Sequence, residues 1–418
     1  MLKQIEGSLG VAEAVALCRP EIICAYPISP QTHIVENLGA MVKKGTLQDC
    51  EFINVESEFA AMSVAIGGSV AGGRAYTATA SQGLLYMAEA VYNASGLGLP
   101  IVMTVASRAI GAPIDSWNDH SDSLSQRDCG WIQLFAEDNQ EAVDLHIQAF
   151  KIAEELSLPV MVCMDGFVLT HAFERMDIPS QEQVDQFLPP YDPRQSLDPE
   201  NPVSIGAMVG PEAFTEVRYL AHAHHLQAFA AIQKASDEFR EIVGRKSGGL
   251  IDLYRPEDAE VMVIAMGSVI GTIKDVIDEM RADGKKIGLL SVKSYRPFPA
   301  AEVADALKGV KTAVVIDRAL QVGIGGVVTD GVIRATRNMS DLDSCGVIAG
   351  LGGRAITKHS LHQIFDMALK KDLPELYFLD LDKKVVEDQL KHEQEERHSG
   401  PMAEAIVKAV ADLHKGEL

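Results

Sequence analysis

The chain has 418 residues, of which 47% are apolar, and it carries 37 Lys and Arg against 59 Asp and Glu, for a formal net charge of −22. This length and apolar content predict a well-cored globular protein of two or three domains. The negative charge, with no Lys/Arg-rich block to interrupt it, argues against nucleic acid as a partner.

The N-terminal sequence MLKQIEGSLG lacks the continuous apolar run of a signal peptide, and no stretch reaches the roughly 18 apolar residues that a membrane span needs. We therefore expect a cytoplasmic protein without a membrane span. The six cysteines, at positions 18, 24, 50, 129, 163 and 345, include no C-x-x-C pair. This spacing predicts no disulfide framework and no zinc or iron–sulfur site, so any redox cluster would belong to a partner.

Strand-like apolar runs alternate with helical patterns through the first 171 residues. The runs occupy 22–26 (IICAY), 52–55 (FINV), 75–80 (AYTATA), 101–106 (IVMTVA) and 160–164 (VMVCM). The segments between them place apolar residues three and four positions apart, as amphipathic helices do. Residues 1–171 are therefore expected to form a doubly wound α/β domain on a parallel sheet.

The pattern changes after this domain. Residues 179–202 are rich in Pro, Gln and Asp, which is typical of an extended, irregular connection, and a long polar helix is expected over roughly 212–245. We assign 172–249 to this linker and helix. Strand–helix alternation then resumes with VMVIAMGS, IGLLSV, TAVVID and SCGVIAGLGG, which predicts a smaller α/β domain over 250–365. Residues 366–418 contain the charged run LDKKVVEDQLKHEQEERH and are expected to form a solvated helical tail.

Two kinds of loop could hold ligands but are better explained structurally. The stretch Asp115–Ser123 concentrates three acids and a histidine, yet it lacks the ligand spacing of an EF-hand or a zinc motif. We expect a hydrogen-bonded, lid-forming loop there and assign no metal ligand in the chain. The glycine clusters at 323–326 and 350–353 match neither G-x-G-x-x-G nor a Walker motif, and tight strand-to-helix turns are favoured.

Polar side chains follow four of the predicted strands at their carboxyl ends. They are Ser29 in PISPQTH, Glu56 and Glu58 in ESE, Ser81 and Gln82 in SQG, and Arg108 in SRAIGAP. Ligands of open parallel sheets bind outside this edge, so we expect these side chains to share one rim. Most of them are also common at helix caps and first turns, where they need no further function. Arg108 is more suggestive, because a strand end does not require a cation.

Six motifs in order, YPISPQTH, NVESE, TASQG, SRAIGAP, DSWNDHSDS and MDGFVLTH, resemble the α subunit of 2-oxoacid:ferredoxin oxidoreductases of the pyruvate synthase type. The later motifs MGS, SYRPFP, IDRA and GLGGR are similar to the companion domain of the same subunit. The resemblance implies a pyrimidine-type thiamine-diphosphate-binding domain over 1–171, followed by a transketolase C-terminal-like domain over 250–365. The implied reaction is the CoA-dependent oxidative decarboxylation of a 2-oxoacid to an acyl-CoA and CO2.

The resemblance also implies roles for the strand-end residues. The family's carboxyl group that hydrogen-bonds the cofactor's pyrimidine carries over onto Glu58, with Glu56 as the alternative. Arg108 and Ser29 are implied to bind the substrate carboxylate, and Ser81 and Gln82 to contact the cofactor.

One departure leaves the substrate open. The family most often has threonine where Ser29 stands, so a methyl group is missing and the pocket could be larger. The substrate is therefore expected to be pyruvate or a bulkier 2-oxoacid, including branched-chain and aryl acids such as phenylglyoxylate.

An absence predicts partners. No G-D-G segment followed by an Asn-Asn pair occurs in the chain, so the Mg²⁺ and diphosphate half of the cofactor site is missing. The resemblance implies that a β subunit carries that half, and that γ and ferredoxin-like δ subunits complete a complex whose partner subunits hold [4Fe-4S] clusters. Ferredoxin is the implied electron acceptor, with NAD reached through an additional flavin subunit as the alternative.

Two other functions remain as hypotheses. A non-catalytic scaffold subunit would not need Glu58, Arg108 and the hydroxyl of Ser29, so their presence argues against it. A self-contained thiamine enzyme, such as a transketolase, would need the missing diphosphate motif.

Overall fold

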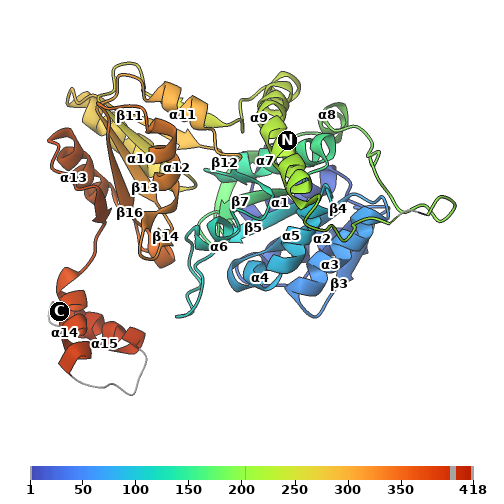
Figure 1. Cartoon of the computed structure of the whole chain (residues 1–418), viewed down its shortest axis with the longest axis horizontal. Coiled ribbons are helices and arrows are strands. Elements are labelled where there is room, and N and C mark those ends of the chain that lie inside the picture. The colour runs from blue at the N-terminus through green and yellow to red at the C-terminus, as the bar shows by residue number, and fades with distance from the viewer. Residues whose placement is uncertain (1, 203, 396–401, 416–418) are drawn as a thin grey trace.

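The structure is a computed structural model that describes residues 2–202, 204–395 and 402–415. It contains two lobes, each built on a mostly parallel sheet with helices on both faces (Figure 1). The N-terminal lobe carries the larger sheet, and the C-terminal lobe is coloured yellow to red in Figure 1. This is the α/β architecture with a smaller second unit that the sequence predicts.

The first lobe contains a seven-stranded sheet in the order β12-β6-β7-β5-β4-β2-β3. All neighbours are parallel except β12, which runs antiparallel to β6. Five strands coincide with the predicted apolar runs to within one residue, whereas β6 is short and includes a polar Gln133. The strands are β2 (Ile22–Ala25), β3 (Glu51–Asn54), β4 (Ala75–Thr79), β5 (Val102–Ser107), β6 (Ile132–Phe135), β7 (Val160–Asp165) and β12 (Ser294–Arg296).

Helices cover both faces of this sheet, so its central strands are buried throughout. One face packs against α1 (Gly7–Leu17), α2 (Thr32–Lys44) and α7 (Asn139–Leu156). The other face packs against α3 (Glu58–Val70), α4 (Ser81–Tyr86) and α5 (Ala88–Gly96). The short α6 (Ser121–Ser125) lies beside α4.

The second lobe contains a six-stranded sheet in the order β17-β16-β13-β10-β11-β9, in which only β9 is antiparallel. Its strands are β9 (Ile251–Tyr254), β10 (Val261–Ala265), β11 (Ile287–Val292), β13 (Thr312–Asp317), β16 (Asp343–Ile348) and β17 (Leu376–Phe378). Helices α10 (Val269–Ala282) and α13 (Lys358–Leu369) cover one face. Helices α11 (Ala300–Ala306) and α12 (Val327–Thr336) cover the other, and α12 follows the small hairpin of β14 (Leu320–Gln321) and β15 (Gly325–Gly326).

The segment between the lobes is more regular than its composition indicates. Strand β8 (Phe173–Asp177) pairs antiparallel with β1 (Leu2–Glu6). Helix α8 (Gln181–Phe187) then forms inside the stretch that the sequence predicts to be irregular. Its start is stabilised by a capping box in which the side chains of Ser180 and Gln183 each bond the other's backbone N–H. A seven-residue helix is too short to give a clear apolar period, which is why the composition dominates the prediction.

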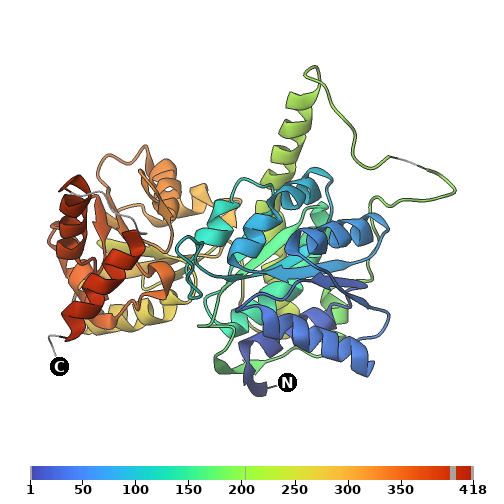
Figure 2. The same cartoon turned by 90° about the horizontal axis from the view of Figure 1, so that it is seen from below.

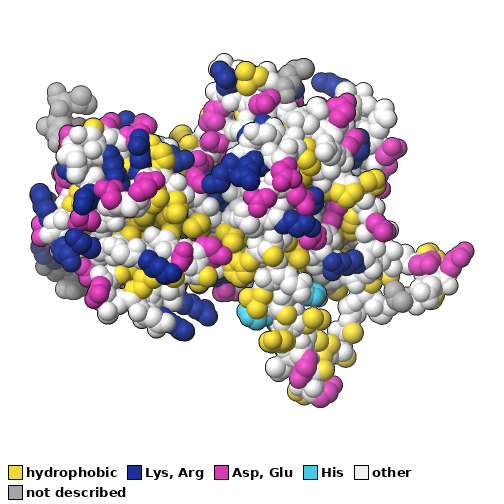
Figure 3. Space-filling model, turned by 90° about the horizontal axis from the view of Figure 1, so that it is seen from above, with side chains coloured by type: hydrophobic (Ala, Val, Ile, Leu, Met, Phe, Trp, Pro, Cys, Tyr) yellow, Lys and Arg dark blue, Asp and Glu magenta, His cyan; other side chains and the backbone are white. Residues whose placement is uncertain are grey.

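Helix α9 (Phe214–Val243) is the long helix expected from the sequence. Its C-terminal half packs into the core of the first lobe, while its N-terminal end projects outward (Figure 2). Apolar side chains gather on this projecting end (Figure 3), and those more than one-third exposed are Phe214, Val217, Tyr219, Leu220 and Leu226. An exposed apolar face of this kind is typical of a protein–protein contact.

The C-terminal segment contains more than a helical tail. Residues of β17 add an edge strand to the second sheet before helices α14 (Lys383–Glu395) and α15 (Met402–Lys415), which contact each other. Three residues are too few for a strand period to be visible in the sequence. No helix within the described residues is both long and apolar enough to cross a membrane.

The lobes share structure as well as a linker. Strand β12 belongs by sequence to the second lobe but joins the first sheet, and one apolar cluster runs from Met103 and Trp131 to Met262 and Leu290. The nearly buried Lys293 ammonium lies 2.7 Å from both Glu137 and Glu141 across the same junction. The lobes therefore meet over a continuous core.

A buried carboxylate completes the junction. Asp165, at the end of β7, bonds His120 (2.9 Å), Arg318 (2.5 Å) and the backbone N–H of Ser268 (2.7 Å). Burial alone would raise the pKa of Asp165, but the charges of Arg318 and His120 outweigh it and hold that pKa well below its ordinary value. Asp165 is thus an ionised carboxylate of the first lobe that binds two groups of the second lobe, the Arg318 guanidinium and the Ser268 backbone.

We predict that Asp165→Asn strongly destabilises the protein. Removing one partner of a buried ion pair leaves the other charge uncompensated and costs about 3–5 kcal/mol. The matched control is Asp343→Asn, which removes an exposed partner of Lys371 and should cost at most about 1 kcal/mol. Urea denaturation followed by circular dichroism measures both, and similar midpoints for the two variants would contradict the assignment.

Candidate functional site

The predicted site residues lie at one edge of the first sheet. Ser29 follows β2, Glu58 follows β3, Ser81 follows β4 and Arg108 follows β5, and these four strands are neighbours in the order β5-β4-β2-β3. From β2 the chain continues to β3 on one side of that strand, and then crosses to form β4 and β5 on its other side. The order of connection therefore reverses between β2 and β4, and ligands of such sheets bind at this reversal.

The Arg108 guanidinium is held by oxygen atoms from two loops and the start of α4. It donates hydrogen bonds to the backbone carbonyl of Ser29 (2.7 Å), the side chain of Gln82 (2.9 Å) and the backbone carbonyl of Asp115 (3.1 Å). Among the residues that the structure describes, no carboxylate forms an ion pair with it. Its charge is therefore positioned at the rim and remains available to an anion.

Ser81 and Gln82 link the loops after β4 and β5. The Ser81 hydroxyl donates to the backbone carbonyl of Ala109 at 2.5 Å, and it also lies 2.5 Å from the Gln82 side-chain oxygen. Ser81 adopts a left-handed backbone conformation, with φ 48°, that serine rarely takes. In this structure Gln82 positions Arg108, and Ser81 positions both Gln82 and the following loop.

Asp122 is a residue of the candidate site that the sequence analysis did not single out. Its fully buried carboxylate accepts backbone N–H bonds from Ser81 (2.8 Å), Arg108 (2.9 Å) and Ser123 (2.6 Å). Burial raises the pKa of Asp122 to about 7, although these hydrogen bonds lower it. The only sequence signal was its place in the acidic stretch 115–123, where nothing marks which acid turns inward.

Glu58 is the first residue of α3 and is 8% exposed. Its neighbour Ser57 caps the helix by accepting a hydrogen bond from the backbone N–H of Ala60. None of the described residues donates a hydrogen bond to the Glu58 carboxyl group. Glu56, the alternative considered from the sequence, is exposed. The two acids of the ESE motif are therefore in different environments, and only Glu58 faces the interior.

Gly83 of the SQG motif makes this placement possible. A Cβ atom at position 83 would lie 2.7 Å from the Glu58 carboxylate oxygen and 2.6 Å from the Thr79 hydroxyl oxygen. Real Cβ atoms do not approach oxygen so closely, so only glycine lets α4 pack against Glu58. The motifs NVESE and TASQG thus meet at a single contact.

The site fits one half of thiamine diphosphate. Glu58 is 8% exposed and its carboxyl group receives no hydrogen bond from a described residue, so a pyrimidine nitrogen of the cofactor would supply the missing partner. Ser29, whose hydroxyl makes no hydrogen bond to a described residue, and Arg108 lie across the same strand reversal. These groups suit the ring end of the cofactor and a substrate anion.

The loop containing Asp115–Ser123 is hydrogen-bonded, as expected, and docks on the second lobe. Asp119 accepts a backbone bond from Gly352 at 3.1 Å, and the backbone N–H of His120 donates to the carbonyl of Arg318 at 2.8 Å. Gly352 and its neighbours at 350 and 353 have positive φ, which explains the glycines of the GLGG turn. This loop connects Arg108 to the interface between the lobes.

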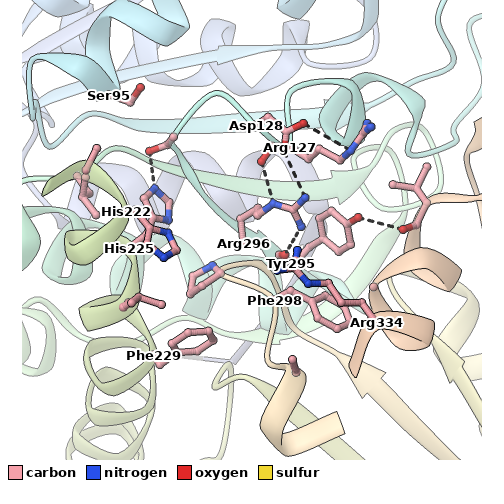
Figure 4. Close-up of a pocket in the computed structure, with 18 of the residues that line it drawn as sticks. Ser95, Arg127, Asp128, His222, His225, Phe229, Tyr295, Arg296, Phe298 and Arg334 are labelled. Carbon is pink, nitrogen blue, oxygen red and sulfur yellow. Dashed lines mark hydrogen bonds and ion pairs between the residues drawn. The ribbon is translucent and has the colours of Figure 1, made fainter. Parts of the chain in front are cut away.

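A separate cavity of about 800 Å³ lies elsewhere (Figure 4). Its lining includes Ser95, Gly130 and Leu158, which precede strands β5, β6 and β7, so it opens at the opposite edge of the first sheet. Arg296 and His225 lie on facing walls in Figure 4, and Arg296 pairs with Asp128 at 3.5 Å. None of the predicted site residues lines this cavity.

Comparison with known families agrees with this geometry. Residues 13–237 match the family described as pyruvate flavodoxin/ferredoxin oxidoreductase, thiamine diphosphate-binding. Residues 259–361 match pyruvate:ferredoxin oxidoreductase core domain II. The two matched regions coincide broadly with the two lobes.

Curated relatives are similar along most of their length. Pyruvate synthase subunit PorA of Methanosarcina barkeri is 46% identical over 370 residues, which cover 88% of this chain and 92% of that protein. Ketoisovalerate oxidoreductase subunit VorA of Pyrococcus abyssi is 40% identical over 357 residues, covering 85% and 90%.

Two solved structures share the fold. A 2-oxoglutarate:ferredoxin oxidoreductase from Magnetococcus marinus superposes with a TM-score of 0.64 at 18% identity, over 88% of this chain and 65% of that one. A split-gene transketolase superposes with a TM-score of 0.52 at 14% identity, over 88% and 99%. These likenesses confirm the predicted thiamine-enzyme fold class. With the family matches and the curated relatives, they lead to one conclusion: the chain belongs to the family of 2-oxoacid:ferredoxin oxidoreductase α subunits.

Proposed function

We propose that this chain is the α subunit of a complex that oxidatively decarboxylates a 2-oxoacid to an acyl-CoA and CO2 in the cytoplasm. The observation that carries the proposal is the pairing, at one strand reversal, of Glu58 with Arg108: among the described residues the largely buried acid has no hydrogen-bond donor and the arginine has no carboxylate partner. A scaffold subunit would gain nothing from either group.

Glu58 is proposed to bind the cofactor. When thiamine diphosphate is bound, its thiazolium ring supplies the electron sink that decarboxylation of a 2-oxoacid requires. The Glu58 carboxyl group would hold a proton at the pyrimidine ring nitrogen, and the low exposure of the site would keep water from competing for that hydrogen bond. Ser81 and Gln82 would border the cofactor while holding the Arg108 loop in place.

Arg108 and Ser29 are proposed to bind the substrate. The Arg108 guanidinium would bind the 2-oxoacid carboxylate, and the Ser29 hydroxyl would donate a hydrogen bond to the same anion. Pyruvate and a branched-chain 2-oxoacid are supported by the names of the curated relatives, pyruvate synthase and ketoisovalerate oxidoreductase. The smaller serine side chain would also admit bulkier acids, including an aryl acid such as phenylglyoxylate.

The rest of the complex is proposed from the family. A β subunit would carry the diphosphate and Mg²⁺ half of the cofactor site, and γ and δ subunits would receive electrons on [4Fe-4S] clusters. Ferredoxin would be the acceptor, or NAD if a flavin subunit is present. The apolar end of α9 gives the chain a surface suited to such contacts.

We predict that the chain expressed alone binds Mg²⁺–thiamine diphosphate weakly and turns over no 2-oxoacid, because the diphosphate half of the site is absent. Isothermal titration calorimetry of the isolated subunit, compared with the complex purified through this chain, measures the difference. Sub-micromolar cofactor binding by the chain alone would contradict a shared site and favour a self-contained thiamine enzyme.

We predict that Glu58→Gln lowers kcat of the assembled complex by about 10²-fold or more, as expected for loss of a general acid–base group. Glu56→Gln is the matched control, because it is the exposed acid of the same motif and should leave kcat nearly unchanged. Hydrogen exchange at the reactive cofactor carbon, followed by NMR, separates this effect from misfolding. An effect confined to Glu56→Gln would show that the wrong acid is assigned.

We predict that Arg108→Ala lowers kcat/KM by the equivalent of about 2–5 kcal/mol, since the substrate anion would be left unpaired. Ser29→Ala should cost about 1–3 kcal/mol, whereas Ser29→Thr should reduce kcat/KM more for an aryl 2-oxoacid than for pyruvate. Arg337→Ala, at an exposed site on the second lobe, is the control. Steady-state kinetics on both substrates measures these values, and equal effects of Ser29→Thr on the two would remove Ser29 as a specificity determinant.

A further inference from the structure

Three side chains far apart in the sequence converge beside the β2–α2 loop. They are Glu6 at the end of β1, His33 in the first turn of α2, and His171 after β7. One ligand atom from each lies within 4.8 Å of the others, and this is the one such cluster found among the described residues. The Glu6 carboxylate lies 2.7 Å from Nδ1 of His33, and the two histidine rings are 4.7 Å apart between centroids.

We propose that Glu6, His33 and His171 form a binding site for a divalent transition metal ion of the Zn²⁺ type. Two imidazoles and one carboxylate are a donor set that such ions prefer, and three protein ligands leave a position for water. His33 and His171 end the motifs YPISPQTH and MDGFVLTH, but none of the three ligands is among the residues proposed to bind the cofactor or the substrate, and the existence of the site does not depend on the proposed function.

The distances suit metal binding after small side-chain rotations. Ligands on tetrahedral zinc stand about 2.0–2.2 Å from the ion, which places them roughly 3.3 Å from one another. The Glu6–His33 contact of 2.7 Å is shorter than this spacing, as expected for two groups that share a proton and not a metal ion. A bound ion would take the place of that proton and draw His171 toward the pair.

The surroundings of His171 fix the orientation of its ring. Its Nδ1 lies 2.8 Å from the hydroxyl oxygen of Thr170, which leaves Nε2 available as a ligand. Thr170 is fully buried and is itself held, because its hydroxyl oxygen accepts the backbone N–H of Phe167 at 2.9 Å. A hydrogen bond from the second ring nitrogen to a fixed partner is characteristic of metal-binding histidines.

The exposure of the three ligands allows entry of an ion. The side chain of His33 is 44% exposed, and Glu6 and His171 are half-buried, so the cluster opens to solvent on one side. On the other side the His171 ring packs at a tilt against Phe167, with 4.8 Å between ring centroids, and the Phe167 ring lies 5.3 Å from that of Trp117. A bound ion would therefore connect the first strand, the start of α2 and the loop after β7, with the 115–123 loop behind them.

The test is direct measurement of metal binding by the untagged full chain. After removal of metal with a chelator, Zn²⁺ is titrated by calorimetry, and equilibrium dialysis gives the stoichiometry. We expect one Zn²⁺ per chain and a rise in the thermal unfolding midpoint of about a few degrees when the ion is in excess, because binding to the folded state alone stabilises it. Co²⁺ should give visible absorption bands that report nitrogen and oxygen ligands.

Variants locate the site. His33→Ala and His171→Ala should each weaken binding by about 100-fold or more, and Glu6→Gln should do the same with little change in shape. His362→Ala is the matched control: His362 lies 2.8 Å from Glu279 in an exposed pair that has no third ligand, and its loss should leave Zn²⁺ binding unchanged. Circular dichroism of the metal-free variants shows whether each one is folded. If a histidine variant is unfolded, Glu6→Gln takes its place in the test.

Two results would overturn the proposal. One is the absence of saturable Zn²⁺ binding by the wild-type chain at Zn²⁺ concentrations up to about 1 mM, which is well above the dissociation constant of a specific zinc site. The other is stoichiometric binding that changes less than tenfold in Glu6→Gln and in the folded histidine variants, which would place the ion elsewhere. Activity of the assembled complex is not needed for either result, so failure here leaves the proposed function standing.

Discussion

The carboxylate of Asp165 occupies the place in the second lobe where an α/β sheet ordinarily binds an anion. In the order β13-β10-β11, the order of strand connection reverses between β10 and β13. The groups at that reversal are the backbone N–H of Ser268, just before α10, and the guanidinium of Arg318. Asp165 binds both, and its pKa is held well below the ordinary value. The second lobe is thereby fixed to the carboxyl end of β7, on the same edge as the candidate site.

This constraint reaches the site through His120. The imidazole bonds Asp165, the preceding Asp119 accepts the backbone N–H of Gly352, and Asp122, two residues further on, accepts the backbone N–H groups of Ser81 and Arg108. Asp122 is therefore the inner support of the rim, since its carboxylate satisfies backbone N–H groups that have no strand partner. Its pKa near 7 follows from this burial, and protonation would weaken the bonds that position both loops.

Glu58 and Arg108 are in the opposite situation. Their side chains are held in place, but among the described residues Glu58 has no hydrogen-bond donor and Arg108 has no carboxylate partner. Gly83 allows α4 to pack beside the Glu58 carboxyl group, and backbone carbonyls orient Arg108 without neutralising it. The contrast between the saturated Asp165 and Asp122 and these two incomplete groups is what supports the proposed ligand site. The incomplete groups lie at the reversal between β2 and β4, which the family relationship connects with thiamine chemistry.

The sequence alone determined the local elements and the family. Buried parallel strands are continuous apolar runs, so five of them were located to within one residue, and motifs such as SQG are readable because close packing demands glycine at position 83. Short elements such as α8 and β17 were missed because they contain too few residues to show a clear apolar period. Only the tertiary structure decided strand order, the burial of Glu58 rather than Glu56, the inward turn of Asp122 and the meeting of Glu6, His33 and His171. Those facts depend on contacts between residues far apart in the chain, and a local pattern of apolar and polar residues carries no record of which distant residue lies opposite.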